Sequence, residues 1–295
     1  MNSSTHILQL PAGPLVSPSW LEHHCSDRRV RILDTRGRVP APGSAPAPMR
    51  HDYEAGHVPG ALFVNWSEDF IDPDDPVPNQ LASPERFAAA AGELGIDEGT
   101  IVVVYDDYRS VFAARLWWAF RAMGHDAVRV LDGGLRGWID SGHALEQGLG
   151  AVHHPTTFTP RPRPELRWTI DQVTSRDEDV VLVDARSRER FAGEGTDPVG
   201  GHIPGAVNAP YVELVGSDGF MRPPDALRAV FARAGIDPDD PSATLVASCG
   251  SGISASVPLL ALEALRADSG TRAAVYDGSW AEWSRSGQPI TTGPA

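Results

Sequence analysis

A glycine-rich loop around Cys249 is the part of this chain whose residue types point most directly to chemistry. The sequence CGSGIS lies between an apolar run typical of a β-strand and a run typical of an α-helix. In such a turn, backbone amides and the positive end of the helix point into the loop and favour a thiolate. The thiolate is the nucleophilic form of cysteine, so we predict that Cys249 is a catalytic nucleophile. The active-site loop then comprises Gly250, Gly252, Ile253 and Ser254 in addition to Ser251.

A lone cysteine is more often a small buried apolar residue than a reactive one. The glycines that flank Cys249 and its position between strand and helix favour the reactive interpretation. Cys25 has no such surroundings, and we expect two free thiols with different roles.

The elements that must position Cys249 occur twice along the chain, as three short strings repeat in the same order. Repeats of this kind indicate two copies of one domain. After the central apolar strand, one copy has Asp106 where the other has Cys249. The repeated strings are DTR at 34–36 and DAR at 184–186, GHVPGA at 56–61 and GHIPGA at 201–206, and DGGLRGW at 132–138 and DGSWAEW at 277–283.

Each copy predicts an α/β fold with a mostly parallel sheet flanked by helices. Its apolar runs are short, continuous and separated by helix-like segments, which is typical of strands buried on both faces. Sites in such sheets gather at the carboxyl ends of strands, where Cys249 lies. The predicted strands are 30–35, 101–106, 128–132, 180–184, 244–248 and 273–277, and the predicted helices include 111–123 and 253–267.

The repeats divide the chain into two domains of similar length. We expect a non-catalytic N-terminal domain at 1–145, a Pro-rich linker at 146–165 and a catalytic C-terminal domain at 166–295. The repeated DGG and DGSW strings predict turns with tryptophans packed beneath them, and Trp117 and Trp118 predict core or interdomain packing.

Composition restricts the possible partners. The chain has 25 Lys and Arg against 39 Asp and Glu, a formal charge of −14, which argues against a nucleic-acid partner. No apolar run approaches the roughly 18 to 20 residues that span a bilayer, and the first residues do not resemble a signal peptide. We therefore expect no nucleic acid and no membrane as partners, and a cytoplasmic location.

Taken together, the tandem copies, the repeated strings and the CGSGIS loop resemble the two-domain rhodanese-type sulfurtransferases over essentially the whole chain. In that family the first domain has lost its cysteine, as Asp106 suggests here. The resemblance implies two rhodanese-like domains and a Cys249 persulfide that carries sulfur from a small-molecule donor to a thiol, cyanide or a thioredoxin-like acceptor. It implies no cofactor, and we predict no metal because metal-binding motifs are missing from the sequence.

The neutral residues after Cys249 resemble the branch that uses 3-mercaptopyruvate, whereas thiosulfate enzymes typically place basic residues there. Arg190 matches one substrate-binding arginine of that branch, but residues 192–201 contain no basic partner for it. Thiosulfate therefore stays an alternative donor. Ser251 matches a proposed proton-handling residue, and His57 is a possible supporting residue, although the repeat-equivalent His202 favours a structural role for both histidines.

Two other classes of function are weaker alternatives. Cysteine phosphatases of related fold need an arginine six residues after the cysteine, where this chain has Ala255. A non-catalytic binding module would not need Cys249 in an intact glycine loop. The sequence predicts neither the acceptor nor the oligomeric state.

Overall fold

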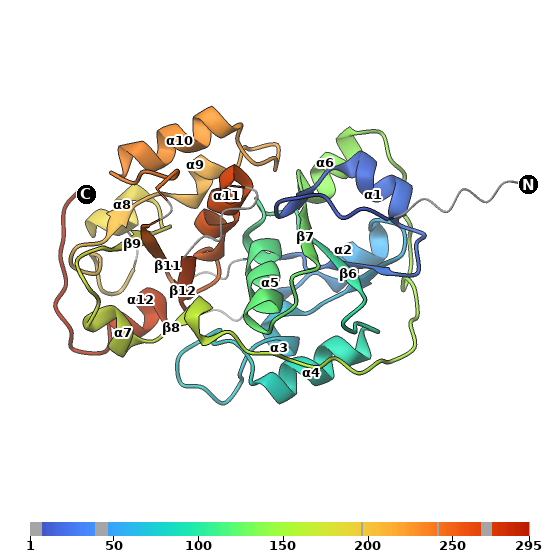
Figure 1. The fold of residues 1–295 in the computed structure, drawn as a ribbon, viewed down its shortest axis with the longest axis horizontal. Coiled ribbons are helices and arrows are strands. Elements are labelled where there is room, and N and C mark those ends of the chain that lie inside the picture. Colours follow the sequence, from blue (N-terminus) through green and yellow to red (C-terminus); the bar gives the residue numbers. More distant parts are fainter. Residues whose placement is uncertain (1–7, 39–46, 196, 241, 267–272, 295) are drawn as a thin grey trace, which may run out of the picture.

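The structure, a computed structural model, describes residues 8–38, 47–195, 197–240, 242–266 and 273–294. Two α/β domains lie side by side, each with a parallel five-stranded sheet (Figure 1). The predicted fold class is confirmed. None of the helices in these residues has the length and apolar character needed to cross a bilayer.

The first domain has its strands in the order β1-β7-β6-β2-β5, all parallel, beside a separate antiparallel pair, β3 and β4. Its strands are β1 (Leu15–Val16), β2 (Val30–Asp34), β3 (Gly37–Arg38), β4 (Ala47–Pro48), β5 (Ala61–Phe63), β6 (Ile101–Tyr105) and β7 (Val128–Leu131). Its helices are α1 (Pro18–His24), α2 (Arg50–Ala55), α3 (Trp66–Asp69), α4 (Pro84–Glu93), α5 (Val111–Ala122) and α6 (Gly134–Asp140).

The second domain repeats this arrangement with the strand order β10-β9-β11-β12-β8, again parallel. Its strands are β8 (Arg167–Trp168), β9 (Val180–Asp184), β10 (Val207–Asn208), β11 (Thr244–Ser248) and β12 (Ala273–Tyr276). Its helices are the 3₁₀ helix η1 (Pro164–Leu166), α7 (Ile170–Thr174), α8 (Arg188–Ala192), α9 (Tyr211–Leu214), α10 (Pro224–Arg233), α11 (Ser256–Arg266) and α12 (Ser279–Trp283).

Alternation along the central strands explains why their sequences are largely apolar. In β11, Leu245 and Ala247 join the core cluster between the domains, whereas Val246 points into the outer cluster of the second domain. In β6, Val104 likewise joins the cluster between the domains, and Val103 points into the outer cluster of the first domain. The six predicted strands are the three central strands of each sheet, within one residue at each end.

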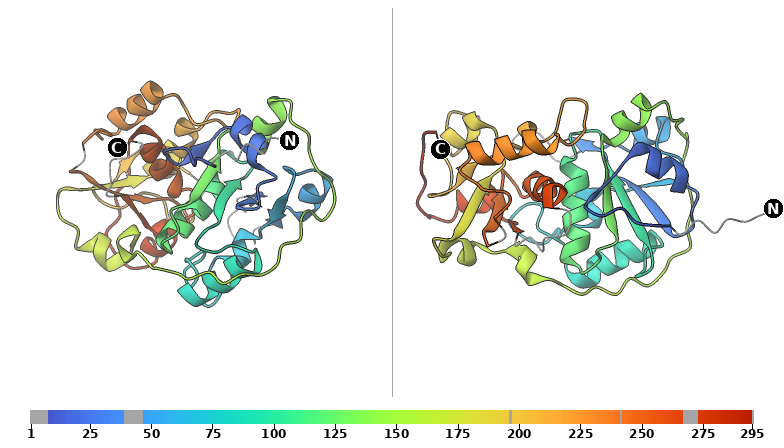
Figure 2. Two further views of the ribbon diagram at one scale, coloured as in Figure 1. Left: turned by 45° about the vertical axis from the view of Figure 1, so that its right-hand side comes forward. Right: turned by 45° about the horizontal axis from the view of Figure 1, so that its top comes forward.

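The domains meet through α5 and α11, which pack against each other between the two sheets (Figures 1 and 2). Trp117 and Trp118 on α5 are buried in the core cluster shared by both domains, in agreement with the predicted packing role. The segment 147–163 runs along the first domain without helix or strand and donates backbone hydrogen bonds to its carbonyls, such as that from Arg163 to Ala122 (2.7 Å).

One predicted boundary is wrong. Helix α11 begins at Ser256 rather than at residue 253, because Gly252 adopts a φ of +82° and the chain needs residues 249–255 to turn from strand to helix. A side chain at Gly252 would also meet the Asp277 carbonyl oxygen, 2.5 Å from the position of a Cβ atom. The predicted last residue of this helix, Ala267, lies outside the described residues.

Candidate active site

Cys249 follows β11 directly and is 2% exposed, at the carboxyl edge of the second sheet. The beginning of α12 fixes its backbone. The Cys249 amide donates to Ser279 Oγ (3.1 Å), and the amide of Trp280 donates to the Cys249 carbonyl (3.0 Å). The DGSW string therefore holds the cysteine loop, which extends the turn role that the sequence predicts for it.

The backbone amides of the loop remain available to bind an anion. Among the described residues, those of Gly250 to Ser256 donate no hydrogen bond to another protein group. Oriented amides at the start of a helix form a concave site for negative charge. The loop around Cys249 thus has the construction that a thiolate or a terminal sulfur anion requires.

In the first domain, the backbone amides of the equivalent loop bind a carboxylate, that of Asp106. Asp106 takes the position of Cys249 after β6, and its two oxygens accept hydrogen bonds from the amides of Tyr108, Ser110, Phe112 and Ala113, at 2.8–3.0 Å. Burial raises the pKa of Asp106 to about 6, and the backbone hydrogen bonds oppose that rise. An anion is therefore built into the helix start of the copy that has Asp106 at the position of Cys249.

We predict that Asp106→Ala lowers the free energy of unfolding by about 2 kcal/mol, because four amides in the turn before α5 and in its first residues, three of them buried, lose their acceptor. Asp107→Ala is the matched control. Asp107 pairs with Arg38 at the surface, and its loss should cost about 0.5 kcal/mol or less. Urea denaturation of both variants measures the difference, and equal effects would contradict the capping role of Asp106.

The first domain also reaches into the cysteine loop. The Arg115 guanidinium, on α5, donates to the Gly252 carbonyl (3.2 Å), to Asp277 Oδ1 (2.6 Å) and to the Asn79 carbonyl (2.6 Å). The Asn79 side chain donates to the carbonyl of Ser251 (3.2 Å). The loop is therefore held from both domains. Sequence reasoning missed Arg115, although a single charged residue in the apolar run 111–120 is itself a sign of a buried partner.

The two domains hold each other through reciprocal contacts of the repeated aspartates. Asp277 accepts a hydrogen bond from the Leu81 amide of the first domain, and Asp132 accepts one from the Met221 amide of the second, both at 2.8 Å. Leu81 and Met221 each end a small loop closed by an antiparallel bridge. The sequence predicts turns here but not this second role of the repeated strings.

Arg190 lies beside the cysteine loop. A Cβ atom added to Gly250 would be 2.8 Å from its Nη2 atom. Asp197 binds the same guanidinium through two hydrogen bonds, from Nε (2.9 Å) and from Nη2 (2.7 Å). Burial opposes the charge of Arg190, but the hydrogen bonds to Asp197 outweigh it and raise the pKa of Arg190.

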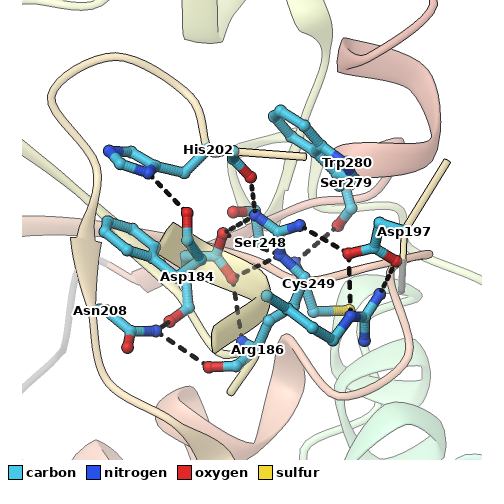
Figure 3. Close-up of polar contacts among 12 residues, drawn as sticks. Asp184, Arg186, Asp197, His202, Asn208, Ser248, Cys249, Ser279 and Trp280 are labelled. Atoms are coloured by element: carbon cyan, nitrogen blue, oxygen red, sulfur yellow. Dashed lines mark hydrogen bonds and ion pairs between the residues drawn. The ribbon is translucent and has the colours of Figure 1, made fainter. Parts of the chain in front are cut away.

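A second arginine, Arg186, is fully buried and also contacts Asp197 (Figure 3). It donates to Asp184, to the Gly201 carbonyl (2.8 Å) and to Asp197 Oδ2 (3.2 Å). In the first domain Arg36 joins Asp34 to the Gly56 carbonyl in the same way. In both domains, the arginine of the DTR or DAR string therefore links the end of a strand to the glycine that precedes the repeated histidine.

Tyr211, at the start of α9, is half-buried and lies near both Cys249 and Tyr108 of the first domain. Burial raises the pKa of Tyr211, and the charges of Tyr108 and Cys249 act in the same direction. Sequence reasoning missed Tyr211 as a neighbour of Cys249.

The structure places His57 and His202 in equivalent positions inside their own domains. His57 Nδ1 contacts the Tyr53 carbonyl oxygen and His202 Nδ1 the Phe191 carbonyl oxygen, both at 2.8 Å. Each imidazole is buried and stacks on the ring of the residue whose carbonyl it contacts. These contacts favour the structural role for both histidines.

Ser251 is partly exposed in the loop, two residues after Cys249. Among the described residues, no group of three or more His, Cys, Asp or Glu side chains could hold a metal ion. Cys25 and Cys249 are both free thiols, and Cys25 is half-buried in the first domain.

Comparison with known proteins gives the class to which this fold and site correspond. The family described as Rhodanese-like domain matches residues 17–141 and 169–286. A 3-mercaptopyruvate sulfurtransferase of Escherichia coli (strain K12) is 37% identical over 275 residues, which cover 91% of this chain and 94% of the relative. A thiosulfate sulfurtransferase of Mus musculus is 37% identical over 291 residues, which cover 94% of each chain.

A solved structure agrees with the sequence comparison. The crystal structure of the 3-mercaptopyruvate sulfurtransferase SseA from Escherichia coli has a TM-score of 0.79 and 34% identity, and covers 91% of this chain and 99% of its own. The chain therefore belongs to the rhodanese-like family. It is a two-domain sulfurtransferase, and these matches do not support the phosphatase and binding-module alternatives.

Proposed function

We propose that this sulfurtransferase takes sulfur from 3-mercaptopyruvate and carries it as a persulfide on Cys249. The observation that carries the choice of donor is the position of Arg190, whose guanidinium lies beside Gly250 and offers its Nη1 and Nη2 atoms toward the loop. A guanidinium binds a carboxylate through two parallel hydrogen bonds. A donor with one carboxylate, bound there, would present its sulfur to Cys249.

In the first step the Cys249 thiolate attacks the donor sulfur, and an S–S bond forms as the C–S bond breaks. The electron pair passes to carbon, and the resulting enolate takes up the proton of the donor thiol to become pyruvate. We propose that the Ser251 hydroxyl relays this proton. A Cys249 persulfide anion remains, and the free amides of Gly250 to Ser256 support its charge.

In the second step an acceptor nucleophile attacks the terminal sulfur and restores the thiolate. With cyanide the product is thiocyanate, and charge is conserved. A small thiol or a thioredoxin-like protein would serve in the same way. We propose that residues 166–295 perform this chemistry, and that residues 1–145, joined by residues 146–165, position the loop without reacting. The cytoplasmic location stays a prediction.

Thiosulfate is the second candidate donor, and it is favoured by the relatives that are named thiosulfate sulfurtransferases. Attack on its outer sulfur would release sulfite and leave the same persulfide. Steady-state assays with both donors and cyanide test the choice. We expect kcat/KM for 3-mercaptopyruvate to exceed that for thiosulfate by at least about tenfold, because Arg190 can hold one carboxylate through two hydrogen bonds whereas the neutral residues after Cys249 offer no cation for a second negative charge. A preference for thiosulfate would contradict the proposed donor.

A further inference from the structure

Arg190, the cation beside the cysteine loop, is already paired with a carboxylate of the same domain, that of Asp197. Asp197 accepts hydrogen bonds from the Nε and Nη2 atoms of Arg190. It also accepts one from Nη1 of Arg186 (Figure 3). Arg186 in turn is paired with the buried Asp184, at 2.6 Å. The two arginines and two aspartates together carry no net charge.

Asp197 is largely buried beside Arg190, and residues 194 and 195 pack on the same arginine. The Asp197 side chain is only 12% exposed. A Cβ atom at Gly195 would be 2.7 Å from the Cγ atom of Arg190, and the amide of Glu194 donates to the Glu189 carbonyl (2.8 Å), so this segment wraps closely around the arginine. The low exposure of Asp197 and its contacts with both arginines make this ion pair part of the site beside Cys249.

Asp197 leaves one edge of the guanidinium for a ligand. It takes the edge formed by Nε and Nη2, whereas the atoms nearest to Gly250 are Nη2 and Nη1, at 2.8 and 3.5 Å from an added Cβ. A donor anion can bind this second edge without displacing Asp197. It then binds a guanidinium whose positive charge is already balanced, close to a fixed carboxylate.

We propose that Asp197 is a specificity-determining residue that disfavours sulfur donors in proportion to their negative charge. This inference rests on the proposed function and extends it to the class of donor. The Coulomb energy between a fixed charge and a ligand doubles when the ligand charge doubles. The carboxylate of Asp197 therefore disfavours a dianion such as thiosulfate twice as strongly, in free energy, as a monoanion such as 3-mercaptopyruvate.

The test removes the charge and keeps the shape. For Asp197→Asn we expect kcat/KM to rise about fivefold with 3-mercaptopyruvate and, since the energy doubles, about 25-fold with thiosulfate at low ionic strength. The matched control is Glu194→Gln, an equal loss of charge from an exposed residue of the same segment, which should change both values by less than about twofold. Equal changes for the two donors, or losses with both, would overturn the proposal.

A second readout does not depend on sulfur transfer. The rates at which iodoacetate and iodoacetamide alkylate Cys249 compare a singly charged reagent with a neutral one, and mass spectrometry separates Cys249 from Cys25. Asp197→Asn should raise the iodoacetate-to-iodoacetamide rate ratio about fivefold, and an unchanged ratio would overturn the proposal. If the wild-type protein transfers sulfur from neither donor, the proposed function fails while this ratio still tests Asp197. Asp197→Ser serves for the same comparison if the asparagine variant does not fold.

Discussion

Cys249→Ser will reduce sulfur transfer by more than about 10³-fold with both 3-mercaptopyruvate and thiosulfate, while the protein keeps its fold. A serine hydroxyl is not ionised in the loop and does not form a persulfide, so the first S–S bond is not made. The buried side chain loses little packing, because sulfur and oxygen differ by a fraction of the volume of a methyl group. Thiocyanate production in the cyanide assay measures the loss.

Cys25→Ser is the matched control for this experiment. Cys25 is half-buried in the first domain, where its thiol contacts the Glu22 carbonyl oxygen (3.4 Å). We expect this variant to retain wild-type activity. Substantial transfer by Cys249→Ser, with circular dichroism showing both variants folded, would contradict the assignment of the nucleophile.

Arg115→Met is the second variant with a large expected effect, on stability as well as on rate. The Arg115 side chain is 6% exposed and its partner Asp277 is 1% exposed. The substitution therefore leaves the negative charge of the buried Asp277 carboxylate without the positive charge of Arg115 beside it. We expect the free energy of unfolding to fall by about 3 kcal/mol. The Gly252 carbonyl also loses its donor, and a loosened loop should lower kcat by on the order of tenfold.

Arg121→Met is the control for Arg115→Met. It removes an interdomain ion pair that is more exposed and does not contact the cysteine loop. Arg121 also lies on α5 and reaches across to Glu263 of α11, but both side chains are about a quarter exposed. Its loss should cost about 1 kcal/mol or less and leave kcat unchanged. Chemical denaturation and the cyanide assay on both variants provide the comparison, and similar behaviour of the two would contradict the positioning role of Arg115.

The sequence predicts the central strands well because they are buried on both faces and therefore largely apolar, with the half-buried Arg31 in β2 and Arg129 in β7 as exceptions. The edge strands β1, β8 and β10 have two residues each, too few for any periodic pattern, and they become strands only by pairing with a central neighbour. The start of α11 is mispredicted for a different reason. Residues 253–255 suit a helix, but the backbone at Gly252 directs the chain into a longer turn.

The site is predictable in its centre and not in its surroundings. Cys249 and its glycines are adjacent in sequence, so their pattern is visible without a fold. Arg115 and Asp277 are far apart in the chain, and only the packing of α5 against the second domain brings them together at 2.6 Å. Asp197 is close to Arg190 in sequence, but its effect depends on the edge of the guanidinium that it binds, which no spacing shows.

The reciprocal contacts of Asp132 and Asp277 bear on how such a protein can evolve. A duplicated domain that has lost its nucleophile would ordinarily be free to accumulate substitutions or to be deleted. Here each half completes the other, and the shared apolar layer between α5 and α11 would be exposed to water if either half were removed. Exchange of one half for that of a distant relative would require matching changes in its counterpart, so the two halves are expected to be inherited together.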